Sequence, residues 1–306
     1  MNNTLYANNI FEQPWWLDIV APNSWKEYLV HDSKGNVLAR QAVVVNKNKI
    51  LMPSLTQTLG IWMADDIVND YGAQKRAIQG LLEQMSEYKN VNICLAPENN
   101  YILPYRWDGY IMEPRFTYRI NDLSNLDELY TGFNKTAKKN IKSATKKVTI
   151  STELDFSELW EMLNKTFESQ NRKNPMHRDL VRDIVLKCEE QNHGRYVCAK
   201  DPDGNVHSCA YFVYDEKVCY YLLGATDSEY RSSGAQSLVI WEGIKFAAEH
   251  SKRFDFEGSM IEGIENFFRQ FNNQCCTYYE VRKQPLVEEI KLLMKPKIKK
   301  IIGYKI

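Results

Sequence analysis

The sequence lacks several features that would place a protein in a specialised class. It carries no net charge, because 39 Lys and Arg residues balance 39 Asp and Glu residues, so any attraction to nucleic acid or anionic lipid must come from local patches. No apolar run approaches the roughly 18 residues of a membrane-spanning helix. The seven cysteines form no CxxC pair, and the five histidines are far apart in the sequence. These spacings predict neither a disulfide framework nor a metal site.

What remains is the composition of an ordinary globular protein. Hydrophobic residues make up 44% of the 306 residues and charged residues 25%, which is enough apolar mass for a packed core. A chain of this length favours two lobes over a single core. The segment Met1–Ile10 has neither a basic start nor an apolar stretch, and we therefore expect a cytoplasmic protein.

An internal repeat is the first specific feature. Two sets of residues coincide at one fixed offset, namely Asp32, Gly35, Asn36, Val37 and Val44 with Asp201, Gly204, Asn205, Val206 and Val213. Glycine-containing turns between β-branched and aromatic residues predict a hairpin in each copy. Each hairpin is followed by a strand, a helix and a short strand, the last at 91–96 and 253–257. The sequence thus predicts an α/β (α+β) protein made of two β-β-β-α-β units.

The second copy contains a recognisable loop. Its strand 220–224 leads through 225–235 directly into a long apolar helix. This resembles the Arg-x-x-Gly-x-Gly/Ala loop of the GNAT acyltransferases, in which loop amides and a helix N-terminus face the pyrophosphate of coenzyme A. Gln236 departs from the pattern at the second small position. The resemblance implies acyl-CoA as a donor and five donor-binding residues, Arg231, Ser232, Ser233, Gly234 and Ala235.

The whole chain resembles a narrower group, the Fem-type (FemABX-like) aminoacyl and acyl transferases. The matching segments, in order, are Phe11–Leu17, Trp107–Tyr110 with Phe116–Tyr118, the Lys-rich stretch from Asn134, and Phe254–Gly258 with Asn266–Phe271. The resemblance implies a tandem duplication of a GNAT-like mixed-sheet lobe. It also implies amide formation on the amine of a cell-wall precursor, with the aminoacyl group taken from tRNA. We expect lobes at 1–145 and 146–285.

The tail at 286–306 alternates lysines with apolar residues. It either docks back on the first lobe or lies on the inner face of an anionic membrane, where lipid-linked precursors are made.

Two residues of the second lobe are candidates for catalysis. Glu257 stands at the end of a predicted strand, where partial burial would give a carboxylate the raised pKa of a general base. The alternative is a solvated or salt-bridged acid. Tyr220 lies on the strand 220–224, whose amides could hold an oxyanion, although a tyrosine there is more often part of the core.

Binding residues are predicted on two surfaces. On a helix over 133–148, Lys135, Lys138, Lys139, Lys142 and Lys146 share one stripe opposite an apolar face. This stripe, above all Lys139 and Lys142, either meets an anion such as tRNA phosphates or is merely solvated. Family position places Trp62 and Asp108 on the first lobe's side of an acceptor cleft, and Tyr279 is a candidate wall residue.

Three hypotheses remain open from the sequence. The leading one is an N-acyltransferase that uses aminoacyl-tRNA and a cell-wall precursor or amino sugar. The second has the same fold and uses acyl-CoA, with no metal in either case. The third is a non-catalytic binding module with a degenerate transferase fold, which recognises nucleic acid or glycan through its basic face. The acceptor and the oligomeric state stay undetermined.

Overall fold

The computed structural model describes residues 6–285, which divide into two compact units. Unit 1 holds the described residues up to Pro114 and from Tyr278 onward, and unit 2 holds Arg115–Thr277. The boundary thus differs from the predicted one at 145/146. The segment 115–145 belongs to unit 2 because strand β6 (Ile111–Ile120) pairs with β11 (Arg253–Asp255), and helix α5 (Lys135–Ala144) packs on α8 (Ala235–His250). The proposed role of 286–306 lies outside the described residues.

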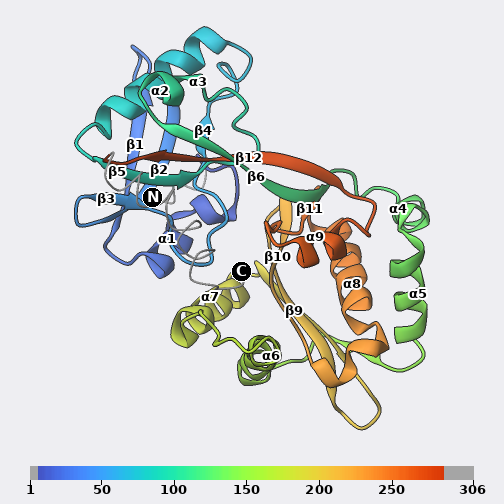
Figure 1. Ribbon diagram of the computed structural model, residues 1–306. Coiled ribbons are helices and arrows are strands. Elements are labelled where there is room, and N and C mark those ends of the chain that lie inside the picture. The colour runs from blue at the N-terminus through green and yellow to red at the C-terminus, as the bar shows by residue number, and fades with distance from the viewer. Residues whose placement is uncertain (1–5, 286–306) are drawn as a thin grey trace, which may run out of the picture. The chain divides into compact units, whose positions relative to one another are not determined.

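Unit 1 is built on a mixed sheet in the order β1-β2-β3-β5-β12, with β4 paired to β2 (Figure 1). Its strands are β1 (Trp25–His31), β2 (Val37–Asn46), β3 (Lys49–Leu51), β4 (Ile61–Met63), β5 (Asn90–Cys94) and β12 (Gln274–Lys283). Its helices are η1 (Ile10–Glu12), α1 (Pro14–Val20), α2 (Tyr71–Gln84) and α3 (Leu103–Trp107). The buried face of α2 packs on β1 and β2 because its apolar residues recur at helical spacing, and Asp70 caps its start.

Unit 2 has a sheet in the order β6-β11-β10-β9-β8-β7. The remaining strands are β7 (Thr149–Ser151), β8 (Gly194–Lys200), β9 (Val206–Tyr214) and β10 (Val218–Thr226). The remaining helices are α4 (Leu126–Gly132), α6 (Phe156–Glu168), α7 (Arg178–Glu190), η2 (Ser228–Ser233) and α9 (Glu262–Phe268). Strands β6 and β12 contribute residues to both units. The predicted mixed α/β architecture is confirmed.

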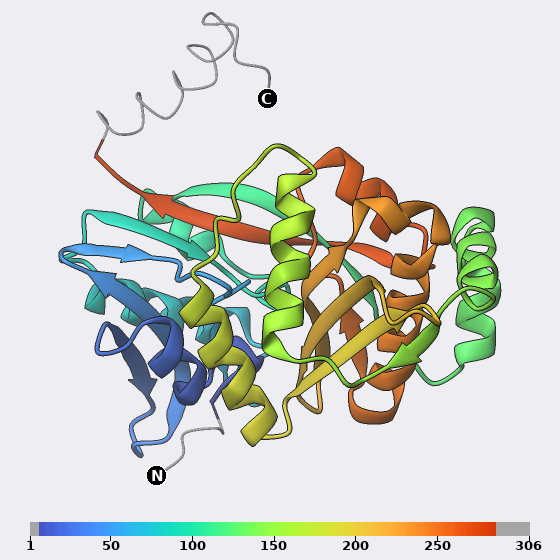
Figure 2. The same ribbon diagram turned by 90° about the horizontal axis from the view of Figure 1, so that it is seen from below.

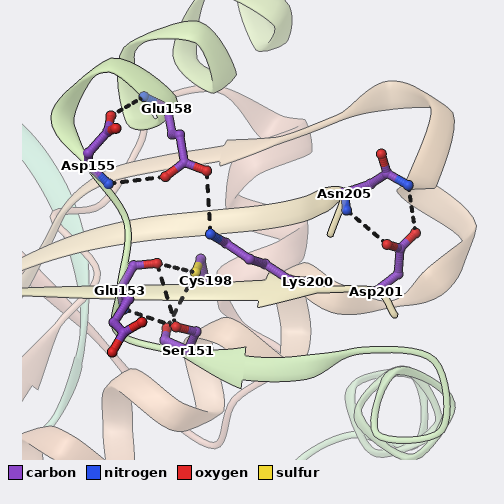
Figure 3. A network of polar contacts seen from close by, with 8 residues as sticks. All are labelled: Ser151, Glu153, Asp155, Glu158, Cys198, Lys200, Asp201 and Asn205. Atoms are coloured by element: carbon purple, nitrogen blue, oxygen red, sulfur yellow. Dashed lines mark hydrogen bonds and ion pairs between the residues drawn. The ribbon is translucent and has the colours of Figure 1, made fainter. Parts of the chain in front are cut away.

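The turns of the two predicted hairpins have the same hydrogen bonds. In unit 1, Asp32 accepts hydrogen bonds on its carboxylate from the main chain and side chain of Asn36, and Gly35 has φ +86°. In unit 2, Asp201 and Asn205 repeat these bonds, and Gly204 has φ +88° (Figure 3). The register of both hairpins slips just before the turn, after Val30 and Ala199. The match that predicted the repeat therefore marks a local structure that occurs twice in the chain.

Helices cover both faces of the sheet of unit 2. Figures 1 and 2 show α6 and α7 on one face and α8 on the other. Alternate residues of β9 make this possible, since Phe212 joins the core under α8 whereas the Tyr211 hydroxyl donates to the carbonyl of Val185 on α7. On the α6 side, Lys200 pairs with Glu158, which also forms the capping box of α6 (Figure 3). No helix within residues 6–285 is long and apolar enough to cross a membrane.

A buried carboxylate ties the start of unit 1 to its sheet. Glu12 is 1% exposed and accepts hydrogen bonds from the main-chain N–H groups of Asn8 and Gly60 at 2.7 and 2.9 Å. The guanidinium of Arg40, also buried, donates to the carbonyl oxygens of Tyr6 and Glu12 and pairs with Glu27. Burial outweighs these bonds and raises the pKa of Glu12 from 4.5 to about 7.

This raised pKa predicts a loss of stability as pH rises. The folded state binds a proton at Glu12 that the unfolded state releases, so the free energy of unfolding falls between about pH 4.5 and 7. The fall amounts to at most about 3.5 kcal/mol, from about 1.4 kcal/mol for each of the roughly 2.5 pKa units between 4.5 and about 7. The free energy of unfolding, measured in urea at several pH values across this range, should fall less steeply with pH in Glu12→Gln than in the parent. Equal slopes would contradict the assignment of this titration to Glu12.

Candidate functional site

A left-handed turn follows strand β11 in unit 2. Glu257 has φ +59° and Gly258 φ +63°, so two successive residues take a conformation that costs a residue with a side chain about 1–2 kcal/mol. Position 258 must be glycine, because a Cβ there would lie 2.2 Å from the carbonyl oxygen of Phe116 on β6. The sequence predicted a strand up to Glu257, whereas the strand ends at Asp255 and Glu257 belongs to the turn.

The carboxyl group of Glu257 has an unusual environment. Its Oε1 atom is buried and has no hydrogen-bond partner among residues 6–285, although the residue as a whole is half-buried. Burial first, and the nearby charge of Asp255 second, raise the pKa of Glu257 well above its ordinary value. A strained backbone that carries an unpaired, hard-to-ionise carboxyl is typical of a functional site. The burial that was expected of this carboxyl is present, and its role as a base stays a prediction.

Three adjacent strands place polar side chains on one face of the sheet beside this turn. Asp255 pairs in register with Tyr220 on β10 and with Arg119 on β6, so all three residues stand on the same side. Tyr220 is 1% exposed. The fold therefore brings Tyr220 next to Asp255, two residues before Glu257, the other residue predicted to be catalytic.

Strand β10 has an irregularity just past Tyr220. Its register against β9 shifts between Tyr221 and Leu223, and its pairing with β11 stops at Tyr220. Tyr221 is also buried. Its hydroxyl bonds Gln236 at the start of α8 and occupies the space that a side chain at Gly224 would fill. Tyr221, which the sequence analysis did not single out for a site, thus accounts for both the glycine at 224 and the glutamine that departs from the GNAT loop pattern.

The predicted donor loop is partly covered. Arg231 and Ser232 on η2 are exposed, but Ser233 and Ala235 are buried, and a Cβ on Gly234 would lie 2.5 Å from the carbonyl oxygen of Asn140 on α5. The N–H of Ala235 already donates to the Ser233 hydroxyl at 3.2 Å. The backbone of α5 therefore lies directly over the loop that the resemblance assigns to a pyrophosphate.

The lysine stripe lies on the outer face of α5. The helix is shorter than predicted and ends at Ala144, and its inner face of Ala137, Ile141 and Ala144 is buried in the core, as expected. Lys139 and Lys142 are exposed. Among residues 6–285, no carboxylate lies within ion-pair distance of Lys135, Lys139, Lys142 or Lys146. Lys147 adds a further cation and donates to the carbonyl of Ser232 at 3.5 Å.

Unit 1 contains a cavity of about 290 Å³ that the sequence analysis missed. The rings of Tyr71 and Tyr101 lie 5.2 Å apart at its wall, and Tyr71 is 67% exposed. The rest of the lining is rich in carboxamides, from Asn8, Asn69, Gln74, Asn99 and Asn100, beside Glu98, Ile61, Met63 and Val68. The available signal was an asparagine-containing segment that ends in a tyrosine, at 69–71 and again at 99–101.

The predicted acceptor residues lie elsewhere in unit 1. Trp62 contacts Tyr6, with ring centroids 4.7 Å apart and ring planes tilted by 58°, and is absent from the cavity lining. Asp108 is exposed and accepts a hydrogen bond from Lys283 at 2.8 Å. Tyr279 packs against the core of unit 1 and therefore belongs to this unit, whereas the predicted boundaries placed it in the second lobe. The structure does not gather these three into one site within the unit.

No cluster of three His, Cys, Asp or Glu side chains able to hold a metal occurs in the part of the chain that the structure describes.

Four of the seven cysteines, Cys188, Cys198, Cys209 and Cys219, are buried, and burial raises their pKa values. Their thiols are consequently poor nucleophiles.

Comparison with known proteins agrees with this architecture. Residues 132–269 match the acetyltransferase (GNAT) domain. The fold is similar to the crystal structure of FemX, with a TM-score of 0.67, 14% identity, and coverage of 89% of this chain and 92% of that one. It is also similar to the C-terminal domain of a putative lysylphosphatidylglycerol synthetase from Agrobacterium fabrum, with a TM-score of 0.57, 10% identity and coverage of 87% and 86%. No curated protein sequence matches the chain.

A third structure, L-PGS from Bacillus licheniformis, is similar over 88% of both chains, with a TM-score of 0.54 and 12% identity. Residues 132–269 therefore form a GNAT domain, and the protein is an acyltransferase by class. The Fem-like resemblance predicted from the sequence is confirmed at the level of the fold.

Proposed function

We propose that this protein transfers an aminoacyl group from aminoacyl-tRNA to the amine of a cell-wall precursor or amino sugar, with Glu257 as the general base. The observation that carries the proposal is the buried Oε1 of Glu257, which has no hydrogen-bond partner in the described part of the chain and lies on left-handed backbone just after β11. A carboxyl with a raised pKa takes protons more readily near neutral pH than an ordinary one does.

The proposed reaction is the aminolysis of an ester. The neutral amine attacks the ester carbonyl, a C–N bond forms, and the bond from the carbonyl carbon to the tRNA 3′-oxygen breaks. Glu257 accepts the proton that the nitrogen loses, and the same proton is then available to the leaving oxygen. Main-chain N–H groups of β10 near the register shift at 221–223 are the candidates to hold the oxyanion.

The choice of tRNA as donor rests on helix α5. Its backbone covers Gly234, and the N–H of Ala235 is taken by Ser233, so a pyrophosphate would find the loop partly closed. The outer face of the same helix carries lysines with no carboxylate partner among the described residues. Such a stripe suits the repeated phosphates of an RNA backbone better than the single pyrophosphate of coenzyme A.

Acyl-CoA is a second candidate donor because residues 132–269 match a domain named for acetyl transfer. Arg231, an exposed residue of the predicted donor loop, could pair with a phosphate of coenzyme A.

For the acceptor we propose the cavity of unit 1. Its two neighbouring tyrosine rings give an apolar surface, and its carboxamides both donate and accept hydrogen bonds. This combination suits a sugar ring with several hydroxyl groups.

Titration with coenzyme A and with total aminoacyl-tRNA, followed by thermal unfolding, tests the donor. Ligand at about 100 times its Kd stabilises a protein by about 2.7 kcal/mol. We expect aminoacyl-tRNA to raise the unfolding temperature and coenzyme A to leave it unchanged. Stabilisation by coenzyme A alone would replace the tRNA proposal by the acyl-CoA version. Binding of tRNA without transfer to any amine would favour the non-catalytic binding module.

A further inference from the structure

Asp255, two residues before the candidate base, forms an ion pair with Arg119 that the proposed mechanism does not use. Asp255 is fully buried, and the side chain of Arg119 is only 4% exposed. The guanidinium Nε donates to Oδ2 of Asp255. Isolated charges rarely remain buried without such a partner, because desolvation costs each ion several kcal/mol. The fold thus pairs a buried carboxylate with a buried guanidinium two residues before Glu257.

The other carboxylate oxygen of Asp255 is bonded to the turn itself. Oδ1 accepts two hydrogen bonds, one from the hydroxyl group of Thr117 at 2.5 Å and one from the main-chain N–H of Glu257 at 2.7 Å. The second bond holds the peptide at the point where the backbone enters its left-handed stretch. Thr117 belongs to β6, whose main chain also contacts Gly258. One carboxylate therefore connects the base's backbone with the neighbouring strand.

We propose that Asp255 is a positioning residue: held by Arg119 and Thr117, it fixes the main chain of Glu257 so that the carboxyl of Glu257 faces the reacting amine. The inference rests on the proposed role of Glu257 as base. It also carries an electrostatic consequence. Burial is the main reason why the pKa of Glu257 is raised, and the negative charge of Asp255 raises it further. Asp255 thus fixes the main chain of the base and adds to its proton affinity without touching the substrate.

The substitution Asp255→Asn tests this directly. It keeps an oxygen that can accept the two hydrogen bonds and removes the charge. We expect the pKa of Glu257, followed by ¹³C NMR in protein with labelled glutamate, to move down toward its ordinary value. The signal is identified by its loss in Glu257→Gln. The acidic limb of the transfer rate should move to lower pH by the same amount, and the rate at its plateau should fall by on the order of 10- to 100-fold.

Two further variants separate positioning from general destabilisation. Thr117→Val removes one hydrogen bond and keeps the charge, so it should slow transfer and leave the pKa of Glu257 where it is. Asp215→Asn is the matched control: Asp215 is another shielded carboxylate that accepts two main-chain N–H bonds, from Lys217 and Val218. It should lower stability without changing the titration of Glu257.

An unchanged pKa of Glu257 in Asp255→Asn, or an equal change in Asp215→Asn, would overturn the inference. Where the single variant does not fold, Arg119→Gln combined with Asp255→Asn replaces both buried charges by amides, and the same downward move is expected. The NMR titration needs no substrate. If the parent protein transfers nothing, the proposed function fails, and the titration still decides whether Asp255 governs Glu257.

Discussion

Glu257→Gln should lower the transfer rate by about 100- to 10,000-fold, the usual contribution of a general base. The glutamine side chain has nearly the same shape and cannot accept the proton of the amine. Affinity for aminoacyl-tRNA should stay within about twofold, because the proposed donor contacts lie on α5. Single-turnover rates and separate binding measurements distinguish the two effects. A variant that transfers at the parent rate would return Glu257 to the role of a structural strand-end acid.

Substitution of Glu257, which should lower the transfer rate, should raise the stability of the fold. Two features of Glu257 cost stability, namely its left-handed backbone and a buried carboxyl oxygen that has no hydrogen-bond partner within residues 6–285. Glycine avoids the first cost, of about 1–2 kcal/mol, and removes the second. We therefore expect Glu257→Gly to abolish transfer and to raise the free energy of unfolding by about 1 kcal/mol, measured in urea. A matched control is Asn272→Gly, at another left-handed position of unit 2, which should gain stability while transfer continues.

The pH dependence of stability gives an independent check. The folded state holds a proton on Glu257 above the pH at which the unfolded chain has lost it. The parent therefore loses stability as pH rises from the ordinary glutamate pKa toward the raised one, and is relatively most stable below that range. The two variants lack this group, so their advantage over the parent should grow with pH in that interval. Activity should rise through the same interval, because only the ionised carboxylate accepts a proton.

Local features of unit 2 were predictable from sequence, and long-range ones were not. The turn at Asp201–Asn205 depends on a glycine and two side chains within five residues, so its repeat at Asp32–Asn36 could be found by alignment. The role of Asp255 depends on Arg119 and Thr117, which are more than 130 positions away and reach it only through the register of β6 against β11. No periodicity in the sequence encodes that register.

The donor loop shows a different reason for a partial prediction. The spacing of Arg231 and Gly234 was sufficient to indicate a GNAT loop, and the domain match agrees. The sequence could not indicate that α5 packs over Gly234, because the glycine that permits close approach of a ligand also permits close approach of a helix. Likewise Tyr220 and Tyr221 are adjacent in sequence, and only the fold decides that Tyr221 bonds Gln236 whereas Tyr220 stands beside Asp255.

The lysine stripe leads to the second large expected effect. Lys139→Glu combined with Lys142→Glu should weaken binding of tRNA by on the order of 10- to 100-fold at low salt. Each of these lysines, if it contacts a phosphate, contributes nearly one unit to the slope of log affinity against log salt concentration. The double variant should therefore lose about two units of slope. Both side chains are exposed, and neither has an acidic partner within residues 6–285, so the fold should be unaffected.

The control reverses the same number of charges away from α5, at the exposed Lys34 in unit 1 and Lys252 in unit 2. Net charge then changes equally, and any effect of overall charge on tRNA binding appears in both proteins. A role for the stripe requires the α5 variant to bind at least tenfold more weakly than this control, with transfer from saturating aminoacyl-tRNA largely preserved. Equal binding by the two variants would mean that the stripe is only a solvated face. The partly covered loop at Gly234 would then be the remaining candidate site for a donor. Acyl-CoA would be the first donor to test.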